Sequence, residues 1–145
     1  MTTFSGNVRQ GQITITDAQL QALDVTPLQL LIAEPGRILV PLSAWIRTNK
    51  PGAAAWTTGP IMRLNYQGDT TALMAANFSS LLNTAAPVNT YANVGSVNTA
   101  SKILGTFNII GKAIFVQFTS VATKGGGSNA TIDVGVVAYS VPLTL

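Results

Sequence analysis

The strongest strand pattern of the chain is the stretch Arg37-Ile38-Leu39-Val40-Pro41-Leu42-Ser43-Ala44-Trp45-Ile46-Arg47. Its even-numbered residues from Ile38 to Ile46 are all apolar and share one face, whereas Ser43, Trp45 and Arg47 share the other. This period of two is the pattern of a β-strand with one buried face. Pro41 has no backbone N–H to give to a sheet, so it indicates a sheet edge or a bulge near the middle of the strand.

Turn signals divide the rest of the chain into similar short segments. The run Glu34-Pro35-Gly36, for example, ends an apolar stretch of strand length. Further strands are predicted at Gln12–Thr16, Leu28–Ala33, Ile61–Tyr66, Ile103–Ile110, Lys112–Ser120 and Thr131–Ser140. Such a series of short strands predicts a mainly β protein, an antiparallel β-sandwich or jelly-roll-like barrel with one short helix.

The helical period is clearest over Asp69–Asn83, where Leu73, Met74, Phe78, Leu81 and Leu82 fall at helical spacing behind Asp69 or Thr70 as a cap. Asp17–Leu23 predicts a single helical turn capped by Asp17. Thr48–Pro60 is expected to be a loop, and Thr84–Ser101 a long surface loop or irregular strands.

The length of 145 residues predicts one domain. Residues 1–11 are polar and without period, which predicts an extended N-terminal arm, and residues 12–145 then form a single β-sandwich domain. The chain start lacks the charged and apolar regions of a signal peptide, and no apolar run reaches the 18 residues of a membrane span. We therefore expect synthesis in a cytoplasm and no membrane partner.

Charge is unusually scarce. Charged residues make up 9% of the chain, against about 25% in ordinary domains, whereas Thr, Asn, Ser and Gln together supply 44 residues. Because soluble monomers normally keep a charged surface and interface cores are depleted of charge, this composition favours a protein that packs against neighbours. The net charge of +3 is spread along the chain without a basic cluster, so no nucleic-acid partner is predicted.

The composition also argues against catalysis. The chain has no Cys and no His, which removes the usual thiolate nucleophile, general base and soft metal ligands. The five carboxylates sit at caps, turns or a polar strand face, namely Asp17, Asp24, Glu34, Asp69 and Asp133. Gly125-Gly126-Gly127 precedes a strand rather than a helix, so it indicates a hairpin connection and not a phosphate loop. We expect no enzyme activity, no cofactor and no metal.

Aromatic residues and the chain ends supply candidate contact sites. Trp45, Trp56, Tyr66 and Tyr91 would suit a sugar-stacking surface, although isolated Trp residues more often complete a core or a subunit contact. The arm can add to a sheet edge of a neighbour. The apolar tail Val141–Leu145 is either a last strand or a contact. The candidate subunit contacts are Phe4, Val8, Arg9, Trp45, Trp56, Tyr91, Leu143 and Leu145.

Two segments resemble small virion proteins of tailed bacteriophages. One is Thr26–Ile32 followed by Glu34–Val40, a Thr-Pro strand, a Pro-Gly turn, a basic residue and an apolar strand. The other is the glycine triplet at 125–127 followed by Thr131–Val136 and Tyr139. The resemblance implies a β-rich structural protein, of the capsid decoration (cement) type. Such a protein sits on the virion surface, binds the major capsid protein of the same virus and commonly forms homotrimers.

One alternative from another class stays open at this point. A receptor- or carbohydrate-binding module of a phage tail fibre or tip would use Trp45, Trp56 and the Asn-rich segment as a sugar platform. A glycan-binding screen would separate the two functions, because a decoration protein is expected to give no signal in it.

Overall fold

The computed structural model describes residues 7–50, 61–69, 73–77, 88–96, 109–121 and 131–142. It contains, in chain order, β1 (Val8–Ile15), α1 (Asp17–Ala22), β2 (Leu28–Leu31), β3 (Arg37–Lys50), β4 (Ile61–Tyr66), β5 (Met74–Asn77), β6 (Val88–Ser96), β7 (Ile114–Phe118) and β8 (Thr131–Pro142).

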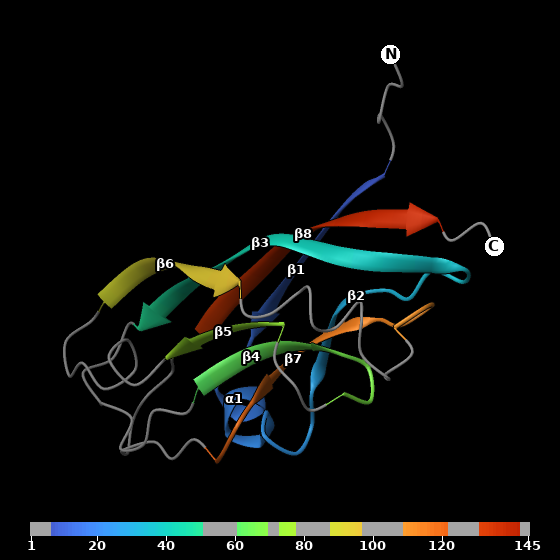
Figure 1. Cartoon of the computed structure of the whole chain (residues 1–145). Coiled ribbons are helices and arrows are strands. Elements are labelled where there is room, and N and C mark those ends of the chain that lie inside the picture. The colour runs from blue at the N-terminus through green and yellow to red at the C-terminus, as the bar shows by residue number, and fades with distance from the viewer. Residues whose placement is uncertain are drawn as a thin grey trace.

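The strands form two antiparallel layers (Figure 1). Sheet A has the order β1-β8-β3-β6, and sheet B has the order β5-β4-β7-β2. The two sheets are joined where β5 pairs with β6, through Met74↔Ser96 and Ala75↔Gly95. In Figure 1 sheet A lies above sheet B, and α1 lies at the lower end of the molecule.

The strand pairing is that of one long hairpin that is folded over on itself. The first strand pairs with the eighth, the second with the seventh, the third with the sixth and the fourth with the fifth. Rolling this ribbon then brings β3 beside β8 and β4 beside β7. This is the eight-stranded jelly roll, an arrangement found in viral capsid and lectin domains. The predicted mainly β sandwich of jelly-roll type is confirmed.

The α1 helix carries the chain from sheet A to sheet B. Thr16, rather than Asp17, is its N-cap: the Thr16 hydroxyl accepts from the Gln19 N–H, and the Gln19 side chain accepts from the Thr16 N–H. This reciprocal pair is a capping box. Leu20 and Leu23 are fully buried, so the helical turn predicted over Asp17–Leu23 is confirmed and its apolar residues close one end of the core.

The bulge predicted at Pro41 is present in β3. The register against β8 shifts between Pro41↔Ala138 and Ser43↔Val137. The extra residue at a bulge re-aims the side chains that follow it. Leu39 is therefore buried before the bulge and Ala44 after it, whereas Leu42 is 47% exposed. The prediction that all even-numbered residues from Ile38 to Ile46 share one buried face is wrong for this reason.

The helix predicted over Asp69–Asn83 is wrong where the structure describes it. Met74–Asn77 is β5, which pairs with β4, and the N–H of Leu73 donates to the carbonyl of Leu64 at 2.7 Å. Gly68 takes a positive φ of 79°, which allows the chain to reverse directly after β4. The reversal delivers this segment to the open edge of β4, and the ladder there outweighs the helical spacing of its apolar side chains.

The outcome differs among three other predicted segments. Val8 to Gly11, assigned to the arm, form the first half of β1 and pair with β8, while residues 1–6 lie outside the described residues. Within Ile103–Ile110 only Ile109 and Ile110 are described, and they belong to a turn. Of the two readings of Thr84–Ser101, the strand reading holds over Val88–Ser96.

The core lies between the two sheets, and its open side is closed by the approach of β1 to β2. The buried side chains come from every strand of both sheets except β5 and β6, in which Ala75 alone has a described side chain. At Gly11 the backbones of β1 and β2 come so close that a Cβ would lie 2.1 Å from the Leu30 carbonyl oxygen. Only glycine fits at this contact, since the opposing atom belongs to the backbone.

We expect Gly11→Ala to lower the free energy of unfolding by about 1–3 kcal/mol, because the added methyl group forces β1 and β2 apart. Urea unfolding followed by tryptophan fluorescence measures the change. Gln12→Ala, one residue further on at an exposed position, is the control and should unfold like the parent protein. Equal stability of both variants would show that β1 and β2 do not approach each other in this way.

Candidate interaction surface

The outer face of sheet A is built from successive rows of residues that cross β1, β8 and β3. The register aligns Val8, Tyr139 and Val40 in one row, and Thr14, Asp133 and Arg47 in another. Between them lie rows through Val137 and through Gly135. The face therefore has an apolar end and a charged end.

Asp133 holds the charged end together. Its carboxylate accepts from the Thr14 hydroxyl at 2.6 Å and from the Arg47 guanidinium at 2.9 Å and 2.5 Å. The hydrogen bond from Thr14 is the main cause that keeps the pKa of Asp133 below its usual value, and Arg47 adds to it. The prediction that Asp133 lies opposite the apolar row is confirmed: it pairs with a cation across strands β1, β8 and β3.

Trp45 occupies the middle of the face. It is half-buried and lies over Gly135, where a Cβ would fall 2.3 Å from its ring. Because Gly135 has no side chain, the indole ring of Trp45 packs directly on the backbone of β8. The sequence signal for this contact was present in the pair Trp45 and Gly135, but the pairing of β3 with β8 was needed to read it.

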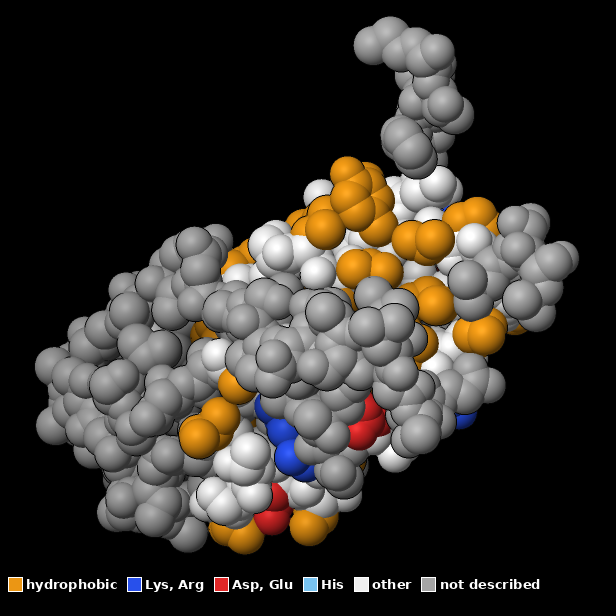
Figure 2. All heavy atoms as spheres, viewed as in Figure 1, with side chains coloured by type: hydrophobic (Ala, Val, Ile, Leu, Met, Phe, Trp, Pro, Cys, Tyr) orange, Lys and Arg blue, Asp and Glu red, His pale blue; other side chains and the backbone are white. Residues whose placement is uncertain are grey.

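The apolar end is exposed. Val8, Tyr139 and Val141 are 46%, 41% and 41% exposed, and we call them, with Val40, the apolar patch. An open hollow of about 470 Å³ lies there, bordered by Asn7, Val40, Tyr139, Ser140, Val141 and Pro142. Figure 2 shows hydrophobic side chains gathered over this part of β3 and β8.

A polar cluster holds β1, β3 and β8 together beside the apolar patch. The Glu34 carboxylate accepts from Arg9 and from the Ser140 hydroxyl and lies 3.1 Å from Arg37. Arg37 in turn donates to the Ser140 carbonyl at 2.8 Å and to the Asn7 amide oxygen at 2.9 Å. These charges are used within the fold, so they do not reduce the apolar character of the patch.

The hydrogen bond from Ser140, followed by that from Arg9, lowers the pKa of Glu34 below its ordinary value. A lowered pKa in the folded state means that this carboxylate stabilises the fold above its unfolded pKa. The stabilisation is lost as the pH falls through the folded value.

The structure brings together only some of the predicted contact residues. Val8 is exposed in the apolar patch, and Arg9 contacts Glu34 of its own chain. Trp45 lies on the same outer face, and Tyr91 lies on β6 opposite Arg47 in the register. Phe4, Trp56, Leu143 and Leu145 lie outside the described residues. The role of all eight in subunit contacts stays a prediction.

Sequence reasoning missed the other members of the apolar patch. Val40 was placed on a buried face, and Tyr139 and Val141 were not chosen as contacts. Their alternation with buried Ala138 and Ser140 along β8 was a usable signal. It could be recognised only once Ile132, Val134 and Val136 were known to mark the inner face.

Tyr66 does not belong to the predicted sugar platform, while Trp56 and the side chain of Tyr91 lie outside the described residues. Tyr66 is fully buried, and its hydroxyl donates to the Leu39 carbonyl at 2.5 Å. Burial raises the pKa of Tyr66 to about 12. Trp45 lies on the outer face of sheet A, whereas Tyr66 fills the core, so these two aromatic rings do not share a surface.

The described residues contain no group of three or more Cys, His, Asp or Glu side chains placed to hold a metal ion. Nor does any helix among them have the length and apolar character needed to cross a membrane.

Comparison with known proteins gives a likeness in structure but none in sequence. No protein-family model matches the chain, and no curated protein matches it in sequence. Among solved structures it is similar to a chain of the "Cyanophage Pam1 capsid asymmetric unit", with a TM-score of 0.49 and 14% identity over 96% of this chain and 89% of that chain. A likeness at this level assigns neither a family nor a function.

We expect Glu34→Gln to lower stability at neutral pH by about 1–3 kcal/mol, because the charge-assisted hydrogen bonds from Arg9 and Ser140 weaken. The difference from the parent should shrink as the pH falls below the ordinary glutamate value of 4.5, where the parent loses the same charge. Thermal unfolding measured across this pH range tests it. Asp24→Asn is the control, since Asp24 makes no ion pair within the described residues. A constant difference at every pH would contradict the role of Glu34.

Proposed function

We propose that this protein is a non-enzymatic structural component of a bacteriophage virion, a capsid decoration (cement) protein that binds and stabilises the assembled head shell. The observation that carries the proposal is the apolar patch on the outer face of sheet A. Val8, Tyr139 and Val141 expose apolar surface on a regular sheet face, where a solitary domain would carry charge.

The distribution of charge supports the same reading. Glu34 and Asp133 are both engaged in ion pairs with arginines of their own chain. Because only 9% of the residues are charged, little further charge remains on the surface to repel other molecules. Cores of protein interfaces have this composition, so the patch suits a protein partner.

The mechanism follows from linkage. A protein that binds the assembled shell and not its separated subunits stabilises the shell by mass action. A homotrimer would contact several capsid subunits at once, and its affinity would rise through effective concentration without new chemistry. The jelly roll then presents the apolar patch to the surface of the shell.

The proposal is tested with a double substitution, Tyr139→Ser with Val141→Ser. Both side chains lie on the outer face and are 41% exposed, so the core stays intact. We expect binding to purified undecorated shells to weaken at least about tenfold, because interface energy concentrates in a few apolar anchors. Cosedimentation with shells measures this, and analytical ultracentrifugation reports self-association on the same samples.

Val25→Ser is the matched control, because Val25 is 76% exposed and lies outside the apolar patch. It should bind like the parent. Undiminished binding by the double variant would remove the patch from the shell contact. A parent protein that ignores shells and is found at low copy number at one vertex of the particle would overturn the decoration function in favour of a tail component.

A further inference from the structure

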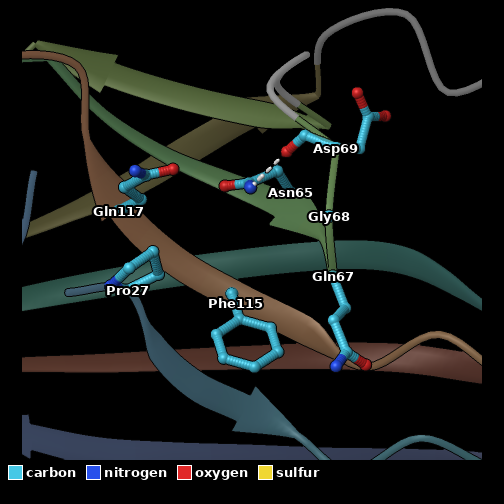
Figure 3. Close-up of a pocket in the computed structure, with 7 residues that line it drawn as sticks. All are labelled: Pro27, Asn65, Gln67, Gly68, Asp69, Phe115 and Gln117. Atoms are coloured by element: carbon cyan, nitrogen blue, oxygen red, sulfur yellow. Dashed lines mark hydrogen bonds between the residues drawn. The ribbon is translucent and has the colours of Figure 1, made fainter. Parts of the chain in front are cut away.

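The outer face of sheet B has a cavity of about 270 Å³ at the junction of β4, β7 and the start of β2 (Figure 3). Asn65 and Phe115 are directly opposite each other in the β4–β7 register and contribute to its lining. Gln67 and Asp69 enter from the turn after β4, Gln117 from β7, and Pro27 from the residue before β2.

Asn65 is the unusual member of the lining. Its side chain is only 4% exposed although it belongs to an outer sheet face. Its amide nitrogen donates to the Asp69 carbonyl at 2.6 Å, but its amide oxygen is buried and accepts no hydrogen bond. A buried acceptor without a donor costs about 1–3 kcal/mol, and native proteins satisfy nearly all such groups with protein, water or ligand.

The surrounding residues are held in place before any ligand arrives. The Gln117 amide donates to the Asp24 carbonyl at 2.7 Å and accepts from Arg63 at 3.0 Å. The turn that carries Gln67 is fixed by two backbone hydrogen bonds, from Gln67 to the Ala113 carbonyl and from Asp69 to the Tyr66 carbonyl, each 2.9 Å long. A site that is ordered in advance loses less entropy on binding.

The lining points to a neutral ligand rich in hydroxyl groups. Side-chain amides both donate and accept, as hydroxyls do, and the lining includes three residues with such amides, Asn65, Gln67 and Gln117. No Lys or Arg is among the described lining residues, which disfavours a phosphate or another anion. Phe115 and Pro27 add apolar walls on the opposite side of the cavity from the Asn65 amide, as Figure 3 shows.

We propose that this cavity binds one pyranose ring of a neutral carbohydrate. A ring hydroxyl donates to the Asn65 amide oxygen, which a small rotation about the broad side-chain torsion of Asn turns toward the cavity. The apolar C–H face of the sugar packs on Phe115 and Pro27, and Gln67 binds a second hydroxyl. The volume is far larger than the roughly 30 Å³ that one water occupies and falls just below the range of drug-sized ligand sites, which suits a single ring.

The site lies on sheet B and uses none of the residues of the apolar patch, so sugar binding and shell binding are tested separately. This proposal revises the expectation that a decoration protein gives no signal in a glycan-binding screen: a signal that maps to this cavity does not count against the decoration function, which the shell-binding experiment decides. The experiment is a titration of ¹⁵N-labelled full-length protein with methyl glycosides of glucose, galactose, mannose and N-acetylglucosamine. At least one glycoside should give saturable NMR shifts of the Asn65 side-chain amide and of the Gln67–Asp69 backbone, with a dissociation constant in the millimolar range.

Gln67→Ala should weaken this binding about fivefold, the equivalent of one hydrogen bond of about 1 kcal/mol. Gln67 is exposed, so the substitution leaves the fold intact. Gln12→Ala, an exposed glutamine on β1 that does not line the cavity, is the matched control and should bind like the parent.

Three results would overturn the proposal. One is the lack of saturable shifts with any of the glycosides. Another is a set of shifts that maps away from the cavity or is unchanged by Gln67→Ala. The last is saturation by a short neutral peptide and by no sugar, which would make the Asn65 oxygen a peptide acceptor.

Discussion

The long strand β8 is the constraint on which the rest of the molecule depends. Its residues pair with β1 on one side and with β3 on the other, over Ile132 to Tyr139 in the first ladder and Thr131 to Pro142 in the second. Strand β8 can pair with both β1 and β3 only when the folded-over hairpin has brought these two strands to either side of it. Once it is in place, it fixes the register of sheet A and therefore every row of residues on the outer face.

Several of the few charged residues in the described part of the chain have a structural role in sheet A. Arg9, Glu34 and Arg37 join β1, β3 and β8 at one end through Ser140. Arg47, Asp133 and Thr14 join the same three strands toward the other end. Cations that would keep an isolated domain soluble are instead used to hold sheet A together. The apolar end of the outer face is left with neutral and apolar side chains, which is the composition of a surface that meets other proteins.

The two sheets offer chemically different surfaces to the outside. Sheet A presents the apolar patch, which suits another protein. Sheet B presents amides around a small cavity, which suits hydroxyl groups. Because the roll places these faces on opposite sides of the core, one can be engaged while the other stays accessible (Figure 1). Structural binding and ligand recognition are therefore compatible in a single domain of this size.

Local sequence patterns were sufficient to predict the strands whose tertiary contacts match the pattern of apolar residues along the strand itself. Ile61–Tyr66 was predicted with its exact bounds, and the segments around β2, β7 and β8 were found to within a few residues, because one face of each is buried in the core. The bulge at Pro41 was also readable, since the missing N–H is a property of proline itself. The loss of a helix at Met74–Asn77 was not readable, because the edge of β4 that captures this segment is a distant part of the fold.

The amino-acid sequence by itself determined the fold class, the lack of catalytic His and Cys chemistry, and the shortage of charge that favours a binding role. Only the tertiary structure decided which residues form each surface. Val8 and Tyr139 are 131 positions apart, and Asn65 and Phe115 are 50 apart, yet each pair is aligned by a ladder. Periodicity tells which side chains share a face of one strand, but the neighbours across a sheet are set by long-range register, and that register exists only when the roll has closed.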